Sequence, residues 1–169
     1  MKITIESNAL RGVDWMCEIA ELLRLAESCP MIEVRRTAGA LRESSRPAGD
    51  PDAAERRRLA STVPALIEAF TIGVSELDGP ESHLTERDEN PDLNAISLSL
   101  WGRPVANLRE ASSDLEDVVH LHTHLRHGQD LFVSTDQQMH ARRYALELLG
   151  IRVRSPAEAL NDARIACSR

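Results

Sequence analysis

The sequence predicts one three-layer α/β/α domain over residues 1–169, built on a mostly parallel sheet of four or five strands. Residues 117–156 alternate helix, strand, helix and strand. A helix between two strands this close in sequence implies a right-handed crossover and therefore parallel strands. Residues 2–6 alternate apolar and polar side chains, which is typical of a short strand. A chain of 169 residues can bury a core without disulfides or structural metal.

The amino-terminal quarter predicts a strand, a helix and a second strand. After the strand over residues 2–6, the spacing of Ile19 and Leu22 predicts a helix over residues 13–25. Pro30 follows this helix and ends it. Residues 31–34 are apolar enough to form the next strand.

The middle of the chain has weaker patterns. Residues 36–43 are expected to form a short helix. A helix is expected over residues 53–70, with a kink or a break at Pro64. Residues 76–93 are acidic and contain Gly and Pro, so they are expected to form a surface loop. Residues 93–101 fit a strand or a helix, because their apolar run is short.

The next element is an amphipathic helix. Val118, Leu121 and Leu125 recur at spacings of three and four, which places them on one face. Asp117 is expected to open this helix, and Gly128 is expected to stop it.

The carboxyl-terminal third predicts two strands and two helices. Residues 130–136 form a short apolar strand bounded by acids, as in a sheet covered on both faces. The following helix ends at Gly150. A strand over 151–153 comes next, and then a helix over 156–165 that Ser155 caps. The apolar face of the helix before Gly150 is expected to contain Met139, Tyr144, Ala145, Leu148 and Leu149.

Acidic side chains lie at the edge of the predicted parallel sheet where such sheets bind ligands. Glu6 and Asp136 follow predicted strands, and Asp117 begins a predicted helix. Ligands of such sheets bind outside the carboxyl ends of the strands. Clustered carboxylates suit Mg²⁺ or Mn²⁺, whereas without a cation the like charges oppose ionisation. These acids are therefore candidate ligands of a divalent metal.

Two stretches resemble a known family. The string DVVHLHTHLRHGQDLFVSTD over residues 117–136, with the helix ending in LLGI and the SPAEAL segment after it, resembles the carboxyl-terminal half of PIN-domain proteins. Residues 1–10, MKITIESNAL, resemble the first strand of that family and its Asp-Thr/Ser-Asn motif. Glu6 stands where the family has Asp, and this is the one departure in that motif.

The resemblance implies a metal-dependent endoribonuclease, a hydrolase of RNA phosphodiester bonds. It implies that Mg²⁺ or Mn²⁺ is bound by four acids, which also act in catalysis: Glu6, Glu43, Asp117 and Asp136. Asn8 and Thr135 occupy the polar positions beside these acids. Many members of the family are toxins of toxin–antitoxin pairs, and members often dimerise. RNA, an antitoxin protein and a second copy of the chain are therefore the expected partners.

Two alternatives stay open at this point. Because Glu6 replaces the expected Asp, the chain could be a degenerate PIN-like domain that binds protein or RNA without catalysis. His120, His124 and His127 follow i, i+4, i+7 spacing, which could bind zinc. The helix lacks the Glu that a hydrolytic zinc helix carries between its histidines. His120 is expected to pack beside the sheet, with His124 and His127 toward solvent.

The net charge of −7 argues against bulk electrostatic binding of nucleic acid. Bound metal would offset the negative charge of clustered carboxylates. Contact with phosphate then needs only local basic side chains, such as Arg126, Arg142 and Arg143. The alternative is that these arginines lie on a solvated helix face. The chain has two Trp, one Tyr and two Phe, too few for binding by base stacking.

The sequence also suggests a compartment. It has no apolar run of the roughly 20 residues that cross a membrane and no apolar signal block at its start. We therefore expect a cytoplasmic protein without a membrane partner. Cys17, Cys29 and Cys167 are an odd set without metal-ligand spacing, which predicts reduced thiols, with Cys17 and Cys29 buried.

Overall fold

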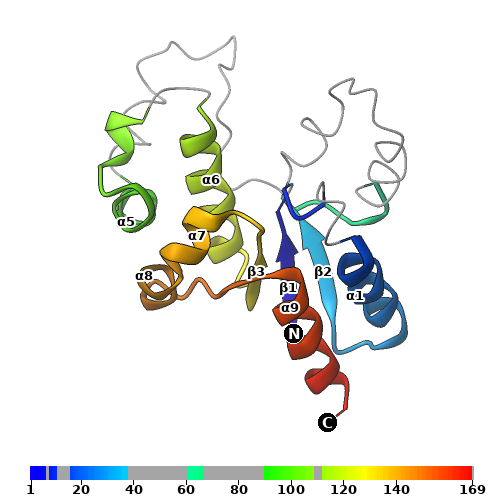
Figure 1. The fold of residues 1–169 in the computed structure, drawn as a ribbon. Coiled ribbons are helices and arrows are strands. Elements are labelled where there is room, and N and C mark those ends of the chain that lie inside the picture. Colours follow the sequence, from blue (N-terminus) through cyan, green and yellow to red (C-terminus); the bar gives the residue numbers. More distant parts are fainter. Residues whose placement is uncertain (7, 11–15, 38–60, 67–89, 109–111, 169) are drawn as a thin grey trace.

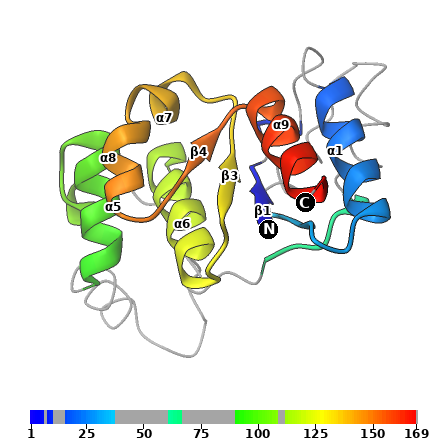
Figure 2. The same cartoon turned by 90° about the horizontal axis from the view of Figure 1, so that it is seen from below.

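The computed structural model describes residues 1–6, 8–10, 16–37, 61–66, 90–108 and 112–168. Within them the chain forms a four-stranded sheet in the order β2-β1-β3-β4. Figure 1 labels β1, β2 and β3, and Figure 2 labels β4 beside β3. Every pairing in the sheet is parallel, and helices flank it. The predicted three-layer α/β/α class with a mostly parallel sheet is confirmed.

The strands are short, and two of them lie later in the chain than expected. Ile32 donates its backbone N–H to the carbonyl of Cys29, so the chain is still turning where residues 31–34 were expected to be a strand. The strand predicted over residues 151–153 is likewise displaced, because Phe132 and Ser134 pair with the backbone of residues 152 and 154. The strands are β1 (Lys2–Ile5), β2 (Glu33–Arg36), β3 (Leu131–Val133) and β4 (Val153–Arg154).

Helices cover the sheet on both sides (Figures 1 and 2). Helices α1 and α9 pack together on one face, and α5, α6 and α8 pack on the other. The helices are α1 (Met16–Ser28), α5 (Pro91–Trp101), α6 (Ser113–Arg126), α7 (Gln137–Ala141), α8 (Arg143–Leu148) and α9 (Pro156–Cys167), with a short 3-10 helix η2 (Val105–Asn107).

The alternation of side chains along β1 assigns each of its residues to one face. Ile3 and Ile5 are buried in the core beneath α1 and α9, whereas Thr4 points to α6. Phe132 of β3 faces the same way as Thr4 and joins the core with α5 and α6. Each face therefore has its own apolar core, as a sheet covered on both sides requires.

The ambiguous segment before residue 101 is helix α5. Asn90 caps it by accepting hydrogen bonds from the backbone N–H groups of Asp92 and Leu93, at 3.0 and 3.2 Å. Pro91 occupies the first turn, where its missing N–H costs nothing. Residues 91–93 are therefore helical and not part of the predicted loop, whose other residues, 76–89, lie outside the described part.

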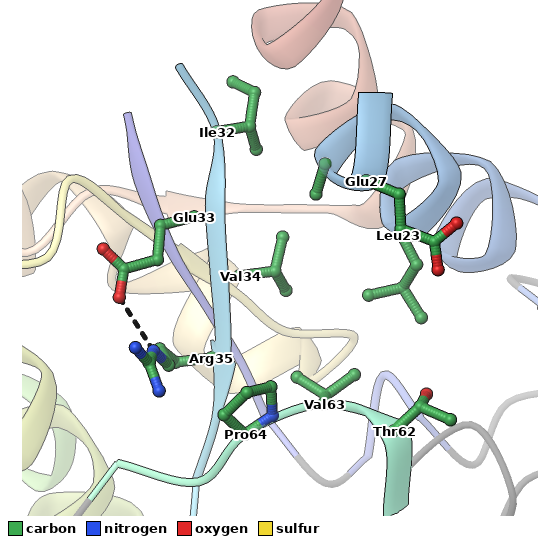
Figure 3. A pocket seen from close by; sticks show the side chains of 10 residues that line it. Leu23, Glu27, Ile32, Glu33, Val34, Arg35, Thr62, Val63 and Pro64 are labelled. Atoms are coloured by element: carbon green, nitrogen blue, oxygen red, sulfur yellow. Dashed lines mark hydrogen bonds and ion pairs between the residues drawn. The ribbon is translucent and has the colours of Figure 1, made fainter. Parts of the chain in front are cut away.

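The break predicted at Pro64 is confirmed, whereas the helical structure expected over residues 63–66 is wrong, and residues 53–60 and 67–70 lie outside the described part. Helical structure stops at Thr62, and Ala65 forms a parallel bridge with Arg36 at the end of β2. Figure 3 shows Val63 and Pro64 beside β2, where the side chain of Val34 points toward α1. Arg36 lies in β2, so the short helix expected over residues 36–43 is wrong at its start, and residues 38–43 lie outside the described part.

The helix expected before Gly150 is divided into α7 and α8. At Arg142 the backbone leaves helical geometry, with φ −102° and ψ 4°. The rotation puts Tyr144 and Leu148 in solvent, 75% and 73% exposed, so their predicted place on the apolar face was wrong. Met139 and Leu146 are the buried residues of the two helices.

The prediction of reduced thiols was wrong for Cys29 and Cys167, whereas the burial predicted for Cys29 is confirmed. Cys29 follows α1, Cys167 ends α9, and the two form a disulfide across 138 residues of sequence. Cys17 is exposed and not buried, and it is the free cysteine of the described residues. Contact between the two helices decides this pairing, which spacing along the chain does not reveal.

Candidate metal-binding site

Three side chains converge beyond the carboxyl end of β1. Glu6 directly follows β1, and Asp117 and His120 come from α6. One ligand atom of each lies within 4.8 Å of those of the other two. Two carboxylates and an imidazole at this spacing could hold a metal ion. This edge of the sheet is where parallel folds place ligands.

Local structure explains why these residues meet. Glu6 donates its backbone N–H to the carbonyl of Val133 at 3.0 Å, which continues the ladder between β1 and β3. Its side chain therefore points to the same face as Thr4, toward α6. On α6, Asp117 and His120 are three residues apart and share one side of the helix.

Asp117 does not open α6, as the sequence had suggested. The hydroxyl of Ser112 accepts a hydrogen bond from the backbone N–H of Leu115 at 3.3 Å and caps the helix. Asp117 consequently lies in the second turn, beside the end of β1. There its carboxylate meets Glu6 instead of the backbone N–H groups of a helix terminus.

Burial raises the pKa of both carboxyl groups, and the charge of Glu6 opposes the ionisation of Asp117, whereas a hydrogen bond with Asp117 lowers the pKa of Glu6. Burial raises the pKa of Glu6 to about 7, hydrogen bonds from Ser134 and Asn8 act against that rise, and the charge of Asp136 adds to it. Burial and the charges of Glu6 and Asp136 raise the pKa of Asp117 to about 8. Near neutral pH both acids are partly protonated. Binding of a cation to them would therefore release protons.

One oxygen of the site has no hydrogen-bond partner in the described structure. Glu6 is 2% exposed, and its Oε2 is buried and unbonded. Buried carboxylate oxygens are nearly always satisfied, so such an atom indicates a missing partner. The orphaned oxygen and the mixed oxygen and nitrogen donors fit a divalent cation.

Polar groups that follow β1 and β3 support Glu6, whose carboxylate is hydrogen-bonded by Asn8 and Ser134. Asn8 donates from Nδ2 to the Ser134 hydroxyl at 3.4 Å and accepts the backbone N–H of Thr135 at 3.2 Å. The Ser134 hydroxyl also accepts the backbone N–H of Asp136 at 2.9 Å. Thus Asn8 lies beside the acids, as predicted, whereas Thr135 is held there through its backbone.

Asp136 lies near the group without joining it. Its Oδ1 caps α7 by accepting the backbone N–H groups of Gln138 and Met139, at 2.7 and 3.1 Å. Its charge still acts on Glu6 and Asp117. Glu43, the fourth predicted acid, lies outside the described residues.

Sequence reasoning missed His120 as a member of this group. It was expected to pack beside the sheet, and it is buried there, 4% exposed. The signal was its spacing of three residues from Asp117 on one helix. That spacing indicates a shared face only when both residues are known to lie within the helix.

The zinc alternative built on three histidines is not supported by the geometry of α6. His124 was expected to approach solvent, and this was wrong: it is fully buried against β1 and β3. Its Nδ1 lies 3.0 Å from the Thr4 hydroxyl, and its ring meets Phe132 edge to face with centroids 5.3 Å apart. His127 is exposed, so the three rings do not gather at one point.

His124 is expected to make the stability of the metal-free protein depend on pH. Burial lowers the pKa of His124 to about 4. As the pH falls below about 6.5, His124 becomes protonated in the unfolded chain but stays neutral in the folded protein. The contribution of His124 to the free energy of unfolding is therefore complete above about pH 6.5. It falls by roughly 3 kcal/mol as the pH is lowered to about 4.

Urea unfolding in EDTA, between pH 4.5 and 7.5, would measure this effect. His124→Gln should be less stable than the wild type at pH 7.5, and the difference should narrow at pH 4.5. The acids of the site titrate in both proteins, so the difference isolates His124. His127→Gln, at the exposed end of the same helix, is the control. Parallel pH profiles of wild type and His124→Gln would contradict the assignment.

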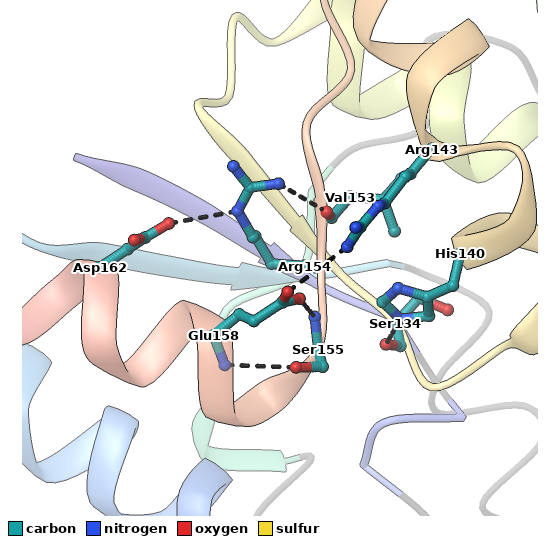
Figure 4. A network of polar contacts seen from close by, with 8 residues as sticks. All are labelled: Ser134, His140, Arg143, Val153, Arg154, Ser155, Glu158 and Asp162. Atoms are coloured by element: carbon teal, nitrogen blue, oxygen red, sulfur yellow. Dashed lines mark hydrogen bonds and ion pairs between the residues drawn. The ribbon is translucent and has the colours of Figure 1, made fainter.

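Two depressions lie elsewhere on the described surface. The groove in Figure 3, of about 300 Å³, has mainly apolar walls from α1, β2 and residues 62–64. A polar depression of about 520 Å³ lies between α8 and α9. Its arginines form ion pairs: Arg143 contacts Glu158 at 3.5 Å and Arg154 contacts Asp162 at 3.3 Å (Figure 4). Neither depression gathers a group of metal ligands.

Comparison of the chain with protein-family models, with curated proteins and with solved structures gives no match. The fold and the site therefore define the class by themselves: a parallel α/β protein with a buried carboxylate–imidazole group at the carboxyl edge of its sheet. No described helix has both the length and the apolar character to cross a membrane.

Proposed function

We propose that the protein is a divalent-metal-dependent nuclease, an endoribonuclease that hydrolyses RNA phosphodiester bonds. The observation that carries the proposal is the convergence of Glu6, Asp117 and His120, with the Glu6 Oε2 left without a partner. The resemblance of residues 1–10 and 117–136 to PIN domains supports RNA as the substrate.

The donor set favours Mn²⁺ over Mg²⁺. Carboxylate oxygens suit both ions, whereas imidazole nitrogen suits transition metals better than Mg²⁺. Glu6, Asp117 and His120 would hold the ion, and Asp136 would add negative charge beside it. Bound there, the cation would stabilise charge on a phosphoryl oxygen and make water a better nucleophile.

The chain's own groups would orient and deprotonate the attacking water. Asn8 and Ser134 hold Glu6 in place, and the partnerless Glu6 Oε2 can accept a proton. The water would lose a proton to Glu6 as its oxygen forms a bond to phosphorus, the bond from phosphorus to the leaving oxygen would break, and that oxygen would take up a proton from solvent water, to which Glu6 then releases its own. The longer Glu6 is compatible with this role because its carboxylate reaches Asp117 and His120.

The test is cleavage of a labelled single-stranded RNA by purified protein in Mn²⁺, Mg²⁺, Zn²⁺ or EDTA. Cleavage is expected with Mn²⁺, more weakly with Mg²⁺, and not with EDTA. Glu6→Gln keeps the shape of the side chain and removes its charge, and it should slow cleavage by about 100-fold or more. Glu116→Gln, an exposed neighbour of Asp117, is the matched control and should cleave as the wild type does.

Two outcomes would count against the proposal. Cleavage that persists in EDTA, or that Glu6→Gln leaves unchanged, would come from a contaminant or another site. Binding of Mn²⁺ without cleavage of any RNA would favour the alternative of a non-catalytic module that binds protein or RNA.

A further inference from the structure

Thr37 contains a second buried oxygen without a partner at the same edge of the sheet. It follows β2 directly, is 1% exposed, and its Oγ1 makes no hydrogen bond in the described structure. Its backbone N–H donates to the carbonyl of Ile5 at 3.1 Å, so the residue continues the parallel ladder between β1 and β2. The backbone of Thr37 is thus satisfied while its hydroxyl is not.

The register places Thr37 beside Glu6. Ile5 pairs with Arg36, so the next residue of each strand, Glu6 and Thr37, are neighbours. Val34 and Arg36 face α1: Val34 belongs to that core, and the Arg36 Nε donates to the Val63 carbonyl. Successive residues of a strand alternate in direction, so Thr37 points to the opposite face, as Glu6 does.

Two partnerless oxygens on neighbouring strands are difficult to explain by packing alone. A buried hydroxyl that lacks a hydrogen bond destabilises the fold, and a valine of the same shape would avoid that cost. Buried polar atoms of this kind are usually bridged by an ordered water, which needs at least two polar partners. Thr37 Oγ1 and Glu6 Oε2 are two such partners on one face of adjacent strands.

We propose that Thr37 is a positioning residue of the acid site: its hydroxyl donates to a water that in turn donates to Glu6 Oε2. This hydrogen-bonded path fixes the direction in which the Glu6 carboxylate faces a divalent cation. The inference rests on the proposed function, because it assumes that the acid site binds such a cation. Outer partners of this kind typically change metal affinity by about 10–100-fold.

The experiment measures Mn²⁺ affinity and metal-free stability in the same variants. Free Mn²⁺ is followed by electron paramagnetic resonance during titration of the full chain, and thermal unfolding is recorded in EDTA. Thr37→Val should weaken Mn²⁺ binding by about tenfold while its melting temperature in EDTA stays equal to or above that of the wild type. Thr37→Ser keeps the hydroxyl and should bind Mn²⁺ within about twofold of the wild type.

Thr123→Val is the matched control. Thr123 is also buried, 2% exposed, with an Oγ1 that has no partner in the described structure, but it lies on α6 and not on the sheet. Its removal should leave Mn²⁺ affinity unchanged.

The outcomes separate this inference from the proposed function. Equal Mn²⁺ binding by wild type and Thr37→Val would overturn the role of Thr37 and leave the acid site intact. A lower melting temperature of Thr37→Val in EDTA, with unchanged affinity, would show a purely structural role and also overturn it. Failure of Thr37→Ser to restore binding would do the same. Absence of Mn²⁺ binding by the wild type would overturn both proposals together.

Discussion

Asp117→Asn is expected to raise the thermal stability of the metal-free protein and to abolish its stabilisation by Mn²⁺. Burial and the charges of Glu6 and Asp136 raise the pKa of Asp117, so its ionised form is disfavoured in the fold. Asparagine removes that penalty, which is roughly 1–3 kcal/mol near neutral pH after allowance for the solvent that Asp117 still contacts. The same change removes a charged ligand, and we expect affinity for Mn²⁺ to fall at least about 100-fold.

Thermal unfolding with and without Mn²⁺ would show both effects. Mn²⁺ at about 100 times its dissociation constant should stabilise the wild type by about 2.7 kcal/mol, and the variant by almost nothing. Glu116→Gln should keep the wild-type response. If Asp117→Asn melted lower than the wild type in EDTA, the carboxylate would be a structural group. If it kept the Mn²⁺ response, Asp117 would not be a ligand.

The affinity for Mn²⁺ is expected to increase with pH, because the two acids must lose their protons to bind the cation. The pKa values of Glu6 and Asp117 are both raised, so protons compete with the cation below about pH 7 to 8. Mn²⁺ should therefore bind more tightly at pH 8 than at pH 6, with release of protons. Calorimetric titration in buffers of different ionisation enthalpy would count those protons. Equal affinity at the two pH values would contradict the raised pKa values.

Loss of the disulfide between Cys29 and Cys167 is expected to cause the largest change in stability. The bond spans 138 residues and joins the end of α1 to the last turn of α9, where Arg164 also pairs with Glu21. A link across so long a loop restricts the unfolded chain, and its removal typically costs about 2–5 kcal/mol. For a chain of this length that corresponds to a fall in melting temperature of roughly 5–20 °C.

Cys29→Ser and reduction of the wild type should give the same destabilised protein. A reducing agent should have no further effect on Cys29→Ser, since the bond is already absent. Cys17→Ser changes an exposed free thiol and should behave as the wild type, including its response to reduction. Thiol titration of the denatured, unreduced wild type should find one free thiol. Three free thiols would contradict the bond.

Local patterns were sufficient for most of the fold. Ser155 was predicted to cap the last helix, and it does: its hydroxyl accepts the Glu158 N–H at 3.2 Å, while Glu158 accepts the Ser155 N–H at 2.8 Å (Figure 4). Gly150 ends α8 with φ +88°, as a left-handed helix stop should. These signals involve residues a few positions apart, so they can be recognised without knowledge of the rest of the chain.

The sequence by itself determined the class of the fold and the acids that approach one another. Periodicity and caps depend on neighbours along the chain, and the order of strands and helices implies parallel pairing. This placed Glu6 and Asp136 at one edge of the sheet and Asp117 on a nearby helix.

Only the tertiary structure decided which side chains meet. It placed His120 with Glu6 and Asp117, buried His124 between α6 and the sheet, and paired Cys29 with Cys167. Each of these contacts joins elements that are distant in the chain. Its geometry depends on how α6 and α9 rotate when they pack on the sheet. That rotation is set by how all the side chains of each core pack together. A short stretch of sequence does not specify this packing.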